Sequence, residues 1–587
     1  MLKLIKNILY LHFLPLHKCR HFPSIPIPTS MLSICESSCR STATITTLLK
    51  ACKYSEHLEQ VQASIIKRGL EQDHFLISLF ISHSLSTLSY SASLFHRVLS
   101  PSTFLWNTLI KTYCQKTLFS DTLSAFVRMK AQGALPDIHT YSSVIKACSS
   151  MCKPLEGKSL HASAFRCGVE HDMFVGTSLV DMYGKGGEIG DARKVFDGMS
   201  HRSVVSWTAM VVGYVTVGDV VEAKKLFDVM PQRNVASWNA MMLGFVKVGD
   251  LSAARSVFDA MPEKNVVSFT TMIDGYAKAG DMAASRFMFE QAKEKDVVAW
   301  SALMSGYVQN GLPTQALKVF LEMESMNVKP DKFVLVSLMS ASSRLGQLEL
   351  AQWVDSYVTK SSVDLRQDHV FSALLDMNAK CGNMERAFKL FEEKPERDLV
   401  SYCAMIQGLS IHGCGEEAVN LFNRMLMEGQ TPDEVAFTVI LTACSHAGLV
   451  DEGWNYFVSM KQKYCLSPSP DHYACMVDLL SRSGKISEAY ELIKLMPGEP
   501  HAGAWGALLG ACKLSGNSKL GVIVANRLFE LEPQNAANYV LLSDIYAAAE
   551  RWIDVSLVRS KMRERRVHKI PGCSKIQLGN LVAEHGN

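Results

Sequence analysis

Apolar and polar residues alternate along this chain in a pattern that predicts pairs of short helices. From Trp207 onward, apolar residues recur at i, i+3, i+4 and i+7, which is the spacing of one helical face. Gly218 and Asp219 follow, a glycine that can end a helix and an aspartate that can cap the next one. Residues 223–230 then repeat the same apolar spacing. We therefore expect two helices joined by a tight turn.

This helix pair recurs at a fixed interval. Its leading aromatic residue returns every 31 residues, at Trp207, Trp238, Phe269 and Trp300. One such hairpin cannot bury its apolar residues alone, whereas a stack of copies can, as in solenoid proteins. We predict an all-α fold, a right-handed α-solenoid superhelix of stacked two-helix (helix-turn-helix) repeats, whose first helices line a concave surface. The aromatic stripe should belong to the core, because it faces the companion helix.

The length of the repeating unit varies in an ordered way. Units of 35 residues that end in Pro-Asp occur at 103–137, 297–331 and 399–433. Each is followed by a unit with a different sequence pattern, at 138–172, 332–367 and 434–469. Units of 31 residues return at 173–203 and 368–398, and an incomplete copy of the repeat occupies about 42–102.

Composition narrows the classes of function. Of the 587 residues, 48% are apolar and 20% are charged, which excludes a disordered or fibrous protein. The net charge is only +3, so a polybasic tail is not the main binding device. No apolar run approaches the roughly 18 residues that a membrane span needs, and we expect no membrane partner. The 16 cysteines should be free thiols, and repeated Ala-Cys pairs such as Ala443-Cys444 indicate close helix packing.

The first residues form a separate segment. Residues 1–35 contain no Asp or Glu but several Lys and Arg, followed by Ser, Thr and Pro, which is typical of an organelle transit peptide. A secretory signal over 8–16 is the alternative, but His12 and Pro15 interrupt that apolar run. An ordinary disordered N-terminus is a third interpretation. The Leu- and Lys-bearing start favours mitochondria over chloroplasts.

The ordered alternation of unit lengths resembles the PLS class of plant pentatricopeptide repeat proteins. Four C-terminal stretches are similar to the E motifs of that family, at 472–480, 505–512, 539–546 and 571–574. A tetratricopeptide array, with a uniform 34-residue period and peptide ligands, fits the 31/35 alternation less well. The resemblance implies a leader over 1–41, degenerate repeats over 42–102, a PLS-type array over 103–501, E motifs over 502–569 and a short tail over 570–587.

In this family each repeat reads one base of single-stranded RNA. The resemblance implies that the fifth and last residues of a unit choose the base and that the second residue, usually Val, clamps it. A base exposed on a single strand can be read in this way by short polar side chains. The clamping residues would be Val205, Val267, Val298 and Val400. Phe104 and Ala236 stand where Val is usual.

The base-reading pairs follow from the same resemblance. They are Asn107 with Asp137 for uridine, Thr208 with Asn234 for adenine, Asn239 with Asn265 for a pyrimidine, and Thr270 with Asp296, Ser301 with Asp331 and Ser372 with Asp398 for guanine. Cys403 with Asp433 and Thr177 with Ser203 match no pair, and the units at 138, 332 and 434 stay unassigned. Units 204–331 should read adenine, pyrimidine, guanine, guanine, 5′ to 3′. The alternative is that the last residues are only helix caps.

No catalytic, cofactor or metal site is expected. Many relatives carry a C-terminal DYW cytidine-deaminase domain, and zinc deaminases need His-x-Glu followed by Pro-Cys-x-x-Cys. His57-Leu58-Glu59 is the only tempting match, it lies in the N-terminal repeats, and no Cys-x-x-Cys occurs. No phosphate-binding glycine pattern appears between a strand and a helix.

By resemblance, the chain would be a site-recognition factor for C-to-U editing of organellar RNA. Its partners would be single-stranded RNA and, in trans, a DYW-type deaminase and multiple organellar RNA editing factor proteins. Two alternatives remain: a factor for RNA splicing, stability or translation, and a tetratricopeptide-like protein-interaction scaffold.

Overall fold

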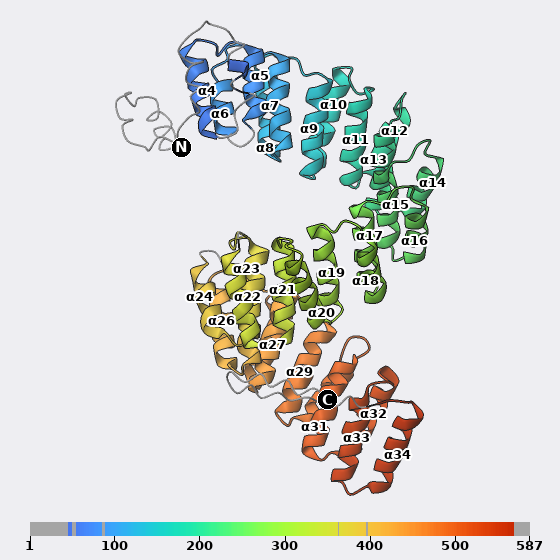
Figure 1. Cartoon of the computed structure of the whole chain (residues 1–587). Coiled ribbons are helices and arrows are strands. Elements are labelled where there is room, and N and C mark those ends of the chain that lie inside the picture. Colours follow the sequence, from blue (N-terminus) through green and yellow to red (C-terminus); the bar gives the residue numbers. More distant parts are fainter. Residues whose placement is uncertain are drawn as a thin grey trace, which may run out of the picture. The chain divides into compact units, whose positions relative to one another are not determined.

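The computed structural model describes residues 45–47, 49, 55–84, 88–361, 363–394 and 397–568 (Figure 1). Within these residues the regular structure is entirely helical, and consecutive helices form hairpins. The chain divides into two compact units, 1–248 and 249–587, which are described separately. The predicted all-α architecture of stacked two-helix repeats is confirmed.

In the first compact unit, odd-numbered labels from α5 onward are the first helices of the repeats and even-numbered labels from α6 onward are the second helices. The helices are α4 Ser55–Lys67, α5 His74–His83, α6 Leu88–Phe95, α7 Thr103–Gln115, α8 Phe119–Ala131, α9 Ile138–Ser150, α10 Pro154–Arg166, α11 Met173–Lys185, α12 Ile189–Gly198, α13 Val204–Thr216, α14 Val220–Val229 and α15 Val235–Lys247.

The second compact unit continues the same numbering. Its helices are α16 Leu251–Ala260, α17 Val266–Lys278, α18 Met282–Gln291, α19 Val297–Gln309, α20 Pro313–Ser325, α21 Lys332–Leu345, α22 Leu348–Lys360, α23 Asp368–Lys380, α24 Met384–Glu393, α25 Leu399–Ile411, α26 Gly415–Met427, α27 Glu434–Ala447, α28 Val450–Gln462, α29 Pro470–Arg482, α30 Ile486–Lys494, α31 Ala502–Ser515, α32 Ser518–Leu531, α33 Ala536–Ala548 and α34 Trp552–Glu564.

The turn between α13 and α14 follows the predicted chemistry. Gly218 has a φ of +84°, a left-handed conformation that glycine adopts without steric cost, and it ends α13. The Asp219 carboxylate then accepts a hydrogen bond from the Glu222 N–H at 3.1 Å and so caps α14. The predicted breaker and cap at 218–219 are therefore confirmed.

Neighbouring first helices pack closely because small residues face each other. In the second compact unit, a Cβ atom added to Gly306 on α19 would lie 2.6 Å from the Ala277 Cβ on α17. The same distance would separate a Cβ on Gly408 of α25 from the Ala379 Cβ on α23. Real carbon atoms do not approach so closely, so this spacing of the repeats requires glycine at both positions.

The aromatic stripe forms core contacts, as predicted, but its partner differs from the expected one. Trp207 on α13 meets Phe196 edge to face, with 4.9 Å between ring centroids, and Phe196 belongs to α12 of the preceding repeat. The companion helix of its own repeat is not the aromatic partner. The equivalent pairs are Phe95–Trp106, Phe227–Trp238, Phe258–Phe269, Phe289–Trp300 and Phe391–Tyr402.

A basic residue just before the end of several units closes the second helix. Arg202 donates to the carbonyl oxygens of Phe196 and Asp197 at 2.9 and 2.8 Å, and its guanidinium lies 5.0 Å from the Phe196 ring centroid. Arg233 repeats this arrangement on α14. The last carbonyl groups of a helix need such donors, so these cations are structural.

The Ala-Cys pairs mark buried thiols at close packing, as predicted. Cys148, Cys444 and Cys512 are buried free thiols, and burial raises the pKa of the Cys444 thiol to about 12. A Cβ on Gly453 of α28 would meet the Cys444 Cβ at 3.6 Å, an ordinary contact distance. These cysteines therefore act as small core residues.

Helices α5 and α6 pack as a pair within the region expected to hold an incomplete repeat. Phe95 of α6 packs on Trp106, as the second-helix phenylalanine does in later repeats. The leader over 1–41 lies outside the described residues, as does the tail over 570–587. Among the described helices, none combines the length and apolar character that crossing a bilayer requires.

Candidate nucleic-acid interface

The second residue of most units is an exposed apolar side chain near the start of a first helix. Its exposed fraction lies between 55% and 64%. The residues are Phe75, Phe104, Phe174, Val205, Val267, Val298, Phe333, Val400 and Val435. Each of the four predicted clamping valines is in this set. An apolar side chain held in solvent at the same place in most repeats is suited to contact a flat partner such as a base.

The last residue of each regular unit is the N-cap of the next first helix. These residues are therefore helix caps, and any base-reading role depends on the side-chain atoms that the cap does not use. At Asp331, the Oδ1 atom accepts the N–H groups of Phe333 and Val334 at 3.1 and 2.9 Å. Side-chain oxygens cap the following first helices in the same way at Asp73, Ser102, Asp137, Asp172, Ser203, Asn234, Asn265, Asp296, Asp398 and Asp433.

The cap determines whether the second side-chain atom of each residue, which lies outside the cap, is a hydrogen-bond donor or an acceptor. The N–H of Ser237 needs an acceptor, so Asn234 turns its Oδ1 to it at 2.9 Å and keeps the Nδ2 amide, a donor, outside the cap. Asp331 also caps through Oδ1, but its second atom is an oxygen, an acceptor. Asn and Asp are therefore equal as caps and opposite in what they can offer to a base.

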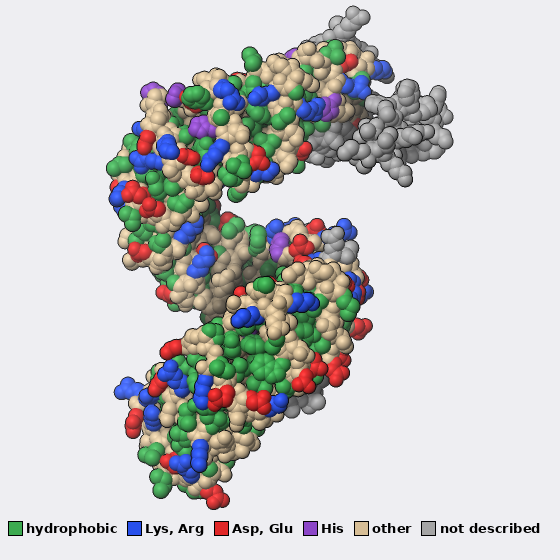
Figure 2. All heavy atoms as spheres, turned by 180° about the vertical axis from the view of Figure 1, so that it is seen from behind, with side chains coloured by type: hydrophobic (Ala, Val, Ile, Leu, Met, Phe, Trp, Pro, Cys, Tyr) green, Lys and Arg blue, Asp and Glu red, His purple; other side chains and the backbone are tan. Residues whose placement is uncertain are grey.

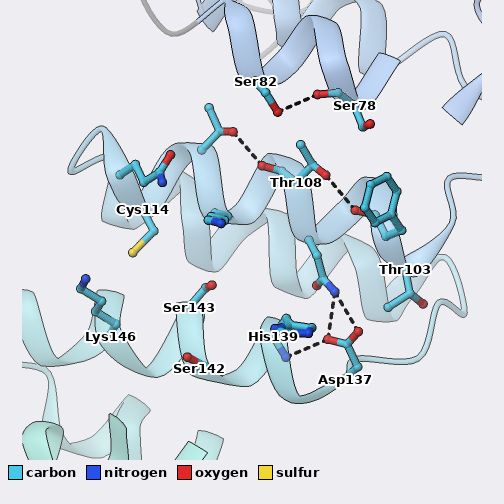
Figure 3. Close-up of a pocket in the computed structure, with 15 residues that line it drawn as sticks. Ser78, Ser82, Thr103, Thr108, Cys114, Asp137, His139, Ser142, Ser143 and Lys146 are labelled. Atoms are coloured by element: carbon cyan, nitrogen blue, oxygen red, sulfur yellow. Dashed lines mark hydrogen bonds between the residues drawn. The ribbon is translucent and has the colours of Figure 1, made fainter. Parts of the chain in front are cut away.

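The structure brings the fifth and last residues of unit 103–137 into direct contact (Figure 3). The Asn107 amide donates to both carboxylate oxygens of Asp137 at 2.9 Å, and Asp137 also caps α9 through the Thr140 N–H at 2.9 Å. Burial by itself would raise the pKa of Asp137, but the bonds from the Thr140 N–H and from Asn107 outweigh it and hold the pKa below its ordinary value. Asp137 is thus a charged acceptor.

The other fifth residues sit half-buried on the same face of their first helices. Thr208 and Thr270 donate their hydroxyl protons to the carbonyl oxygens of Val204 and Val266 at 2.7 and 2.9 Å, which leaves oxygen lone pairs for a ligand. Asn239, Ser301 and Ser372 are half-buried at the equivalent position. Each predicted reading residue therefore lies at a first-helix face or at the cap beside it.

Asp398 resembles Asp137 in its electrostatics. Burial would raise the pKa of Asp398, but the Ser401 hydroxyl at 2.5 Å, the Ser401 N–H at 3.0 Å and the charge of Lys394 together lower it. Its unassigned neighbour Cys403 differs from the other fifth residues, because burial raises the pKa of its thiol to about 12 and keeps it neutral.

Two of the three unassigned units use their polar groups internally. In unit 332–367 the last residue, Gln367, makes no side-chain cap, and its Oε1 accepts from the Lys332 Nζ at 3.1 Å. In unit 434–469 the last residue, Ser469, donates its N–H to the His472 Nδ1 at 2.9 Å. The His472 Nε2 lies 2.8 Å from the Glu434 carbonyl oxygen. The same Nε2 is 3.2 Å from the hydroxyl of Thr438, which is the fifth residue.

The third unassigned unit keeps the regular arrangement. In unit 138–172, Asp172 caps α11 through Oδ1, which accepts from Phe174 and Val175 at 2.9 and 3.1 Å. Its fifth residue, Ser142, is half-buried on α9 and lines the cavity shown in Figure 3. The three units look alike in sequence, and their side-chain contacts separate them.

The paired motifs that a metal-dependent enzyme would need do not come together in the described part of the chain. No three His, Cys, Asp or Glu side chains gather there in a way that could hold a metal ion. The tempting motif at 57–59 falls on α4, and nothing is described of the His57 side chain.

Comparison with known proteins identifies the repeat. The PPR repeat family matches residues 101–150, 233–278, 295–344 and 397–446, and the PPR repeat matches 177–204, 205–235, 267–297, 369–399, 435–465 and 471–500. This chain belongs to the pentatricopeptide repeat family. The E motif of that family matches residues 516–577, which supports the E subgroup. All the matching models are of repeats or of the E motif, and none is of a catalytic domain.

Related proteins of the family cover nearly the whole chain. The Arabidopsis thaliana pentatricopeptide repeat-containing protein At5g37570 is 60% identical over 540 residues, which are 91% of this chain and 98% of that protein. Protein At3g29230 of the same plant is 46% identical, over 91% of this chain and 90% of that one. The crystal structure of the pentatricopeptide repeat protein PPR10 from maize is 16% identical with a TM-score of 0.42, over 92% of this chain and 96% of that one.

Proposed function

We propose that this pentatricopeptide repeat protein binds single-stranded RNA, one base per regular unit. The observation that supports the proposal is the recurrence of one three-residue arrangement along the first helices. It consists of an exposed apolar second residue, a half-buried fifth residue and a last residue that caps the next helix with one atom. Bases that are not paired expose their edges and faces to such a site.

The cap gives a physical reason for base choice. Asp331 presents an acceptor, which suits the ring N–H of guanine or uracil, whereas Asn234 presents a donor, which suits the ring nitrogen of adenine or cytosine. The size and polarity of the fifth residue then separate purine from pyrimidine. This agrees with guanine for Ser301 with Asp331 and with adenine for Thr208 with Asn234.

The net charge of +3 fits recognition of this kind. Figure 2 shows acidic and basic side chains interspersed over the face of each compact unit that it displays. Base edges and apolar clamps would supply most of the affinity, and phosphate contacts would be few.

The decoded RNA is 5′-U-N-N-A-Y-G-G-N-G-3′, where N is unassigned and Y is a pyrimidine, for units 103–398. A gel shift with the full chain tests it. We expect this RNA to bind more tightly than an RNA of the same composition in scrambled order. Equal binding of both would refute base reading, and absence of binding to either would favour the protein-interaction scaffold.

We further propose that the protein selects sites for C-to-U editing of organellar transcripts and recruits a deaminase in trans. The match of the E motif supports this, together with a set of matching models that contains no catalytic domain. The test is sequencing of organellar cDNA from a null mutant. We expect at least one cytidine to lose editing, and unchanged editing with altered introns or transcript levels would establish the splicing or stability alternative instead.

We propose an organelle as the place of action, with mitochondria preferred. The acid-free start of the sequence supports this, and one relative, which is 36% identical, carries a name that ends in "chloroplastic". A fluorescent fusion to residues 1–60 should label mitochondria. Labelling of plastids would correct the organelle, and diffuse cytosolic fluorescence would contradict the proposal.

A further inference from the structure

A cavity of about 870 Å³ opens between α5, α7 and α9 in the first compact unit. Its lining combines the base-reading pair of unit 103–137 with hydroxyl and amide side chains and two lysines, Lys111 and Lys146. Figure 3 shows Asp137 and Lys146 toward opposite ends of α9, with Ser142 and Ser143 between them. The cavity therefore has an acceptor at one end and a cation at the other.

The two lysines hold equivalent places in consecutive repeats. Each is the ninth residue of its unit, four residues after the fifth residue, so Lys111 follows Asn107 and Lys146 follows Ser142 by one helical turn. Residues four apart share one face of a helix, so both lysines extend the base-facing surface. Both are exposed.

No ion pair or side-chain hydrogen bond within the described part of the chain engages either ammonium group. The acidic group that also lines the cavity is Asp137, whose carboxylate is held by Asn107 and by the cap of α9. The lining therefore carries two lysines against one carboxylate, and neither lysine is paired with that carboxylate, so positive charge is in excess at the lysine end.

The ninth residue has the opposite character in other repeats. In unit 173–203 it is Asp181, which pairs with Lys185 at 2.9 Å, and in unit 266–296 it is Asp274, which pairs with Lys278 at 2.7 Å. Lys380 and Arg482 are paired with the ninth-residue aspartates in the same way. The first helices thus neutralise their own cations in these repeats and leave them available at Lys111 and Lys146.

We propose that this cavity is a phosphate-binding site for the RNA backbone and that it anchors the strand beside the base read by Asn107 and Asp137. The inference rests on the proposed function. Single-stranded RNA carries one negative charge per nucleotide, and a concave surface with unpaired cations concentrates it. The neighbouring serine and threonine hydroxyls add donors to phosphate oxygens. Elsewhere along the first helices the strand is held mainly through its bases.

The test is the salt dependence of RNA binding by the full-length double variant Lys111→Gln/Lys146→Gln. Each neutralised phosphate contributes about 0.7 to the slope of log K against log[salt] for a single strand, so the slope should fall by about 1.4. Affinity at 0.1 M salt should fall about 25-fold, which is the same slope converted over one decade of salt. The loss should be equal for RNAs that carry uracil or cytosine opposite unit 103–137, because phosphates carry no base identity.

A matched control is Lys318→Gln/Lys389→Gln, which removes the same net charge from the second helices α20 and α24, where both lysines are exposed and neither is in an ion pair within the described residues. This variant should bind with the slope of the wild type, and thermal melting should show that both double variants are folded. If the wild type binds the decoded RNA and the Lys111→Gln/Lys146→Gln variant keeps the affinity and salt slope of the wild type, the phosphate-binding site is refuted while base reading stands. If the wild type binds no RNA, the proposed function itself has failed.

Discussion

Unit 297–331 and unit 332–367 are neighbours with the same stacking but different use of their last residue. In the first, Asp331 caps α21 with one oxygen and keeps a second oxygen outside the cap. In the second, Gln367 does not cap α23, and its side-chain oxygen is bonded to Lys332. Unit 434–469 goes further, because His472 lies within hydrogen-bonding distance of groups at both its fifth and last residues.

The difference shows that a unit can pack in the stack without keeping the regular capping arrangement of its last residue, which is the arrangement that we propose reads a base. Both units supply a hairpin that packs on the next one, but only in the first does the last residue cap the next helix with one side-chain atom, whereas the side-chain oxygen of Gln367 is bonded to Lys332. The three unassigned units also contribute bonds along the stack. The Ser343 hydroxyl donates to Asp376 of the following repeat at 2.9 Å, and Ser149–Asp181 and Ser445–Asp478 repeat this bond.

The largest effect should come from reversing the polarity of a reading residue while its cap is kept. Asp331→Asn keeps an Oδ1 acceptor for α21 but replaces the outward oxygen by a donor. Preference opposite unit 297–331 should move from guanine to adenine by about 1–3 kcal/mol, about 5- to 150-fold. Binding titrations with RNAs that differ only at this base measure it.

The control for that change is the same chemistry in the neighbouring unit. Gln367→Glu alters a side chain whose oxygen is already hydrogen-bonded to Lys332, so base preference opposite unit 332–367 should not change. A shift of equal size in both variants would mean that the two kinds of unit are not different after all.

A change in the stacking common to both kinds of unit should affect stability and leave base choice unchanged. Gly408→Val places carbon against Ala379, where there is no room, and should lower the free energy of unfolding by about 1–3 kcal/mol. The matched variant Gly510→Val adds the same side chain where nothing lies within 4 Å. Thermal melting should show a loss only for Gly408→Val, and equal losses would contradict the packing argument.

A smaller loss of stability should follow from removing the bond that unit 332–367 makes along the stack. Ser343→Ala deletes the donor to Asp376 and should cost about 1 kcal/mol. Ser340→Ala, on the same helix, serves as the control, because no side-chain hydrogen bond within the described residues engages its hydroxyl. Chemical denaturation compares the two variants, and an altered base preference for Ser343→Ala would argue against a structural role.

The smallest effect on RNA affinity is expected opposite a unit for which we propose no base-reading residue. Changing the RNA base opposite unit 434–469 should alter affinity less than about twofold, because its fifth residue contacts His472. Changing the base opposite unit 138–172 should matter more, with guanine preferred, since Ser142 and Asp172 keep the regular arrangement. Competition binding with single-base variants decides between them.

The fold was largely predictable because its information is local and repeated. The 31-residue interval of the aromatic residues, the Gly-Asp turn and the Ala-Cys pairs each predicted a feature that the structure contains. The aromatic partner was misplaced, since sequence spacing relates Trp207 to its own hairpin but cannot tell which neighbouring helix it touches.

The candidate site was predictable only in part. The residues were placed correctly on first helices and caps, and base reading is the role that we propose for them. Gln367 and Thr438 form side-chain hydrogen bonds with Lys332 and His472, which are 35 and 34 residues away along the chain. The sequence alone does not indicate these bonds. Arg202 donates to carbonyl oxygens at the end of α12, and Lys111 and Lys146 line one cavity. Both arrangements depend on how the chain packs in three dimensions, which the sequence does not state directly.

The most direct test of the central claim is selection of RNA from a random pool by the full-length protein, followed by sequencing. We expect an enriched motif with uracil, two positions of weaker preference, adenine, a pyrimidine, two guanines, an unconstrained position opposite unit 332–367 and a further guanine. A pool with no enriched motif, or a strong preference at the position opposite unit 332–367, would contradict it.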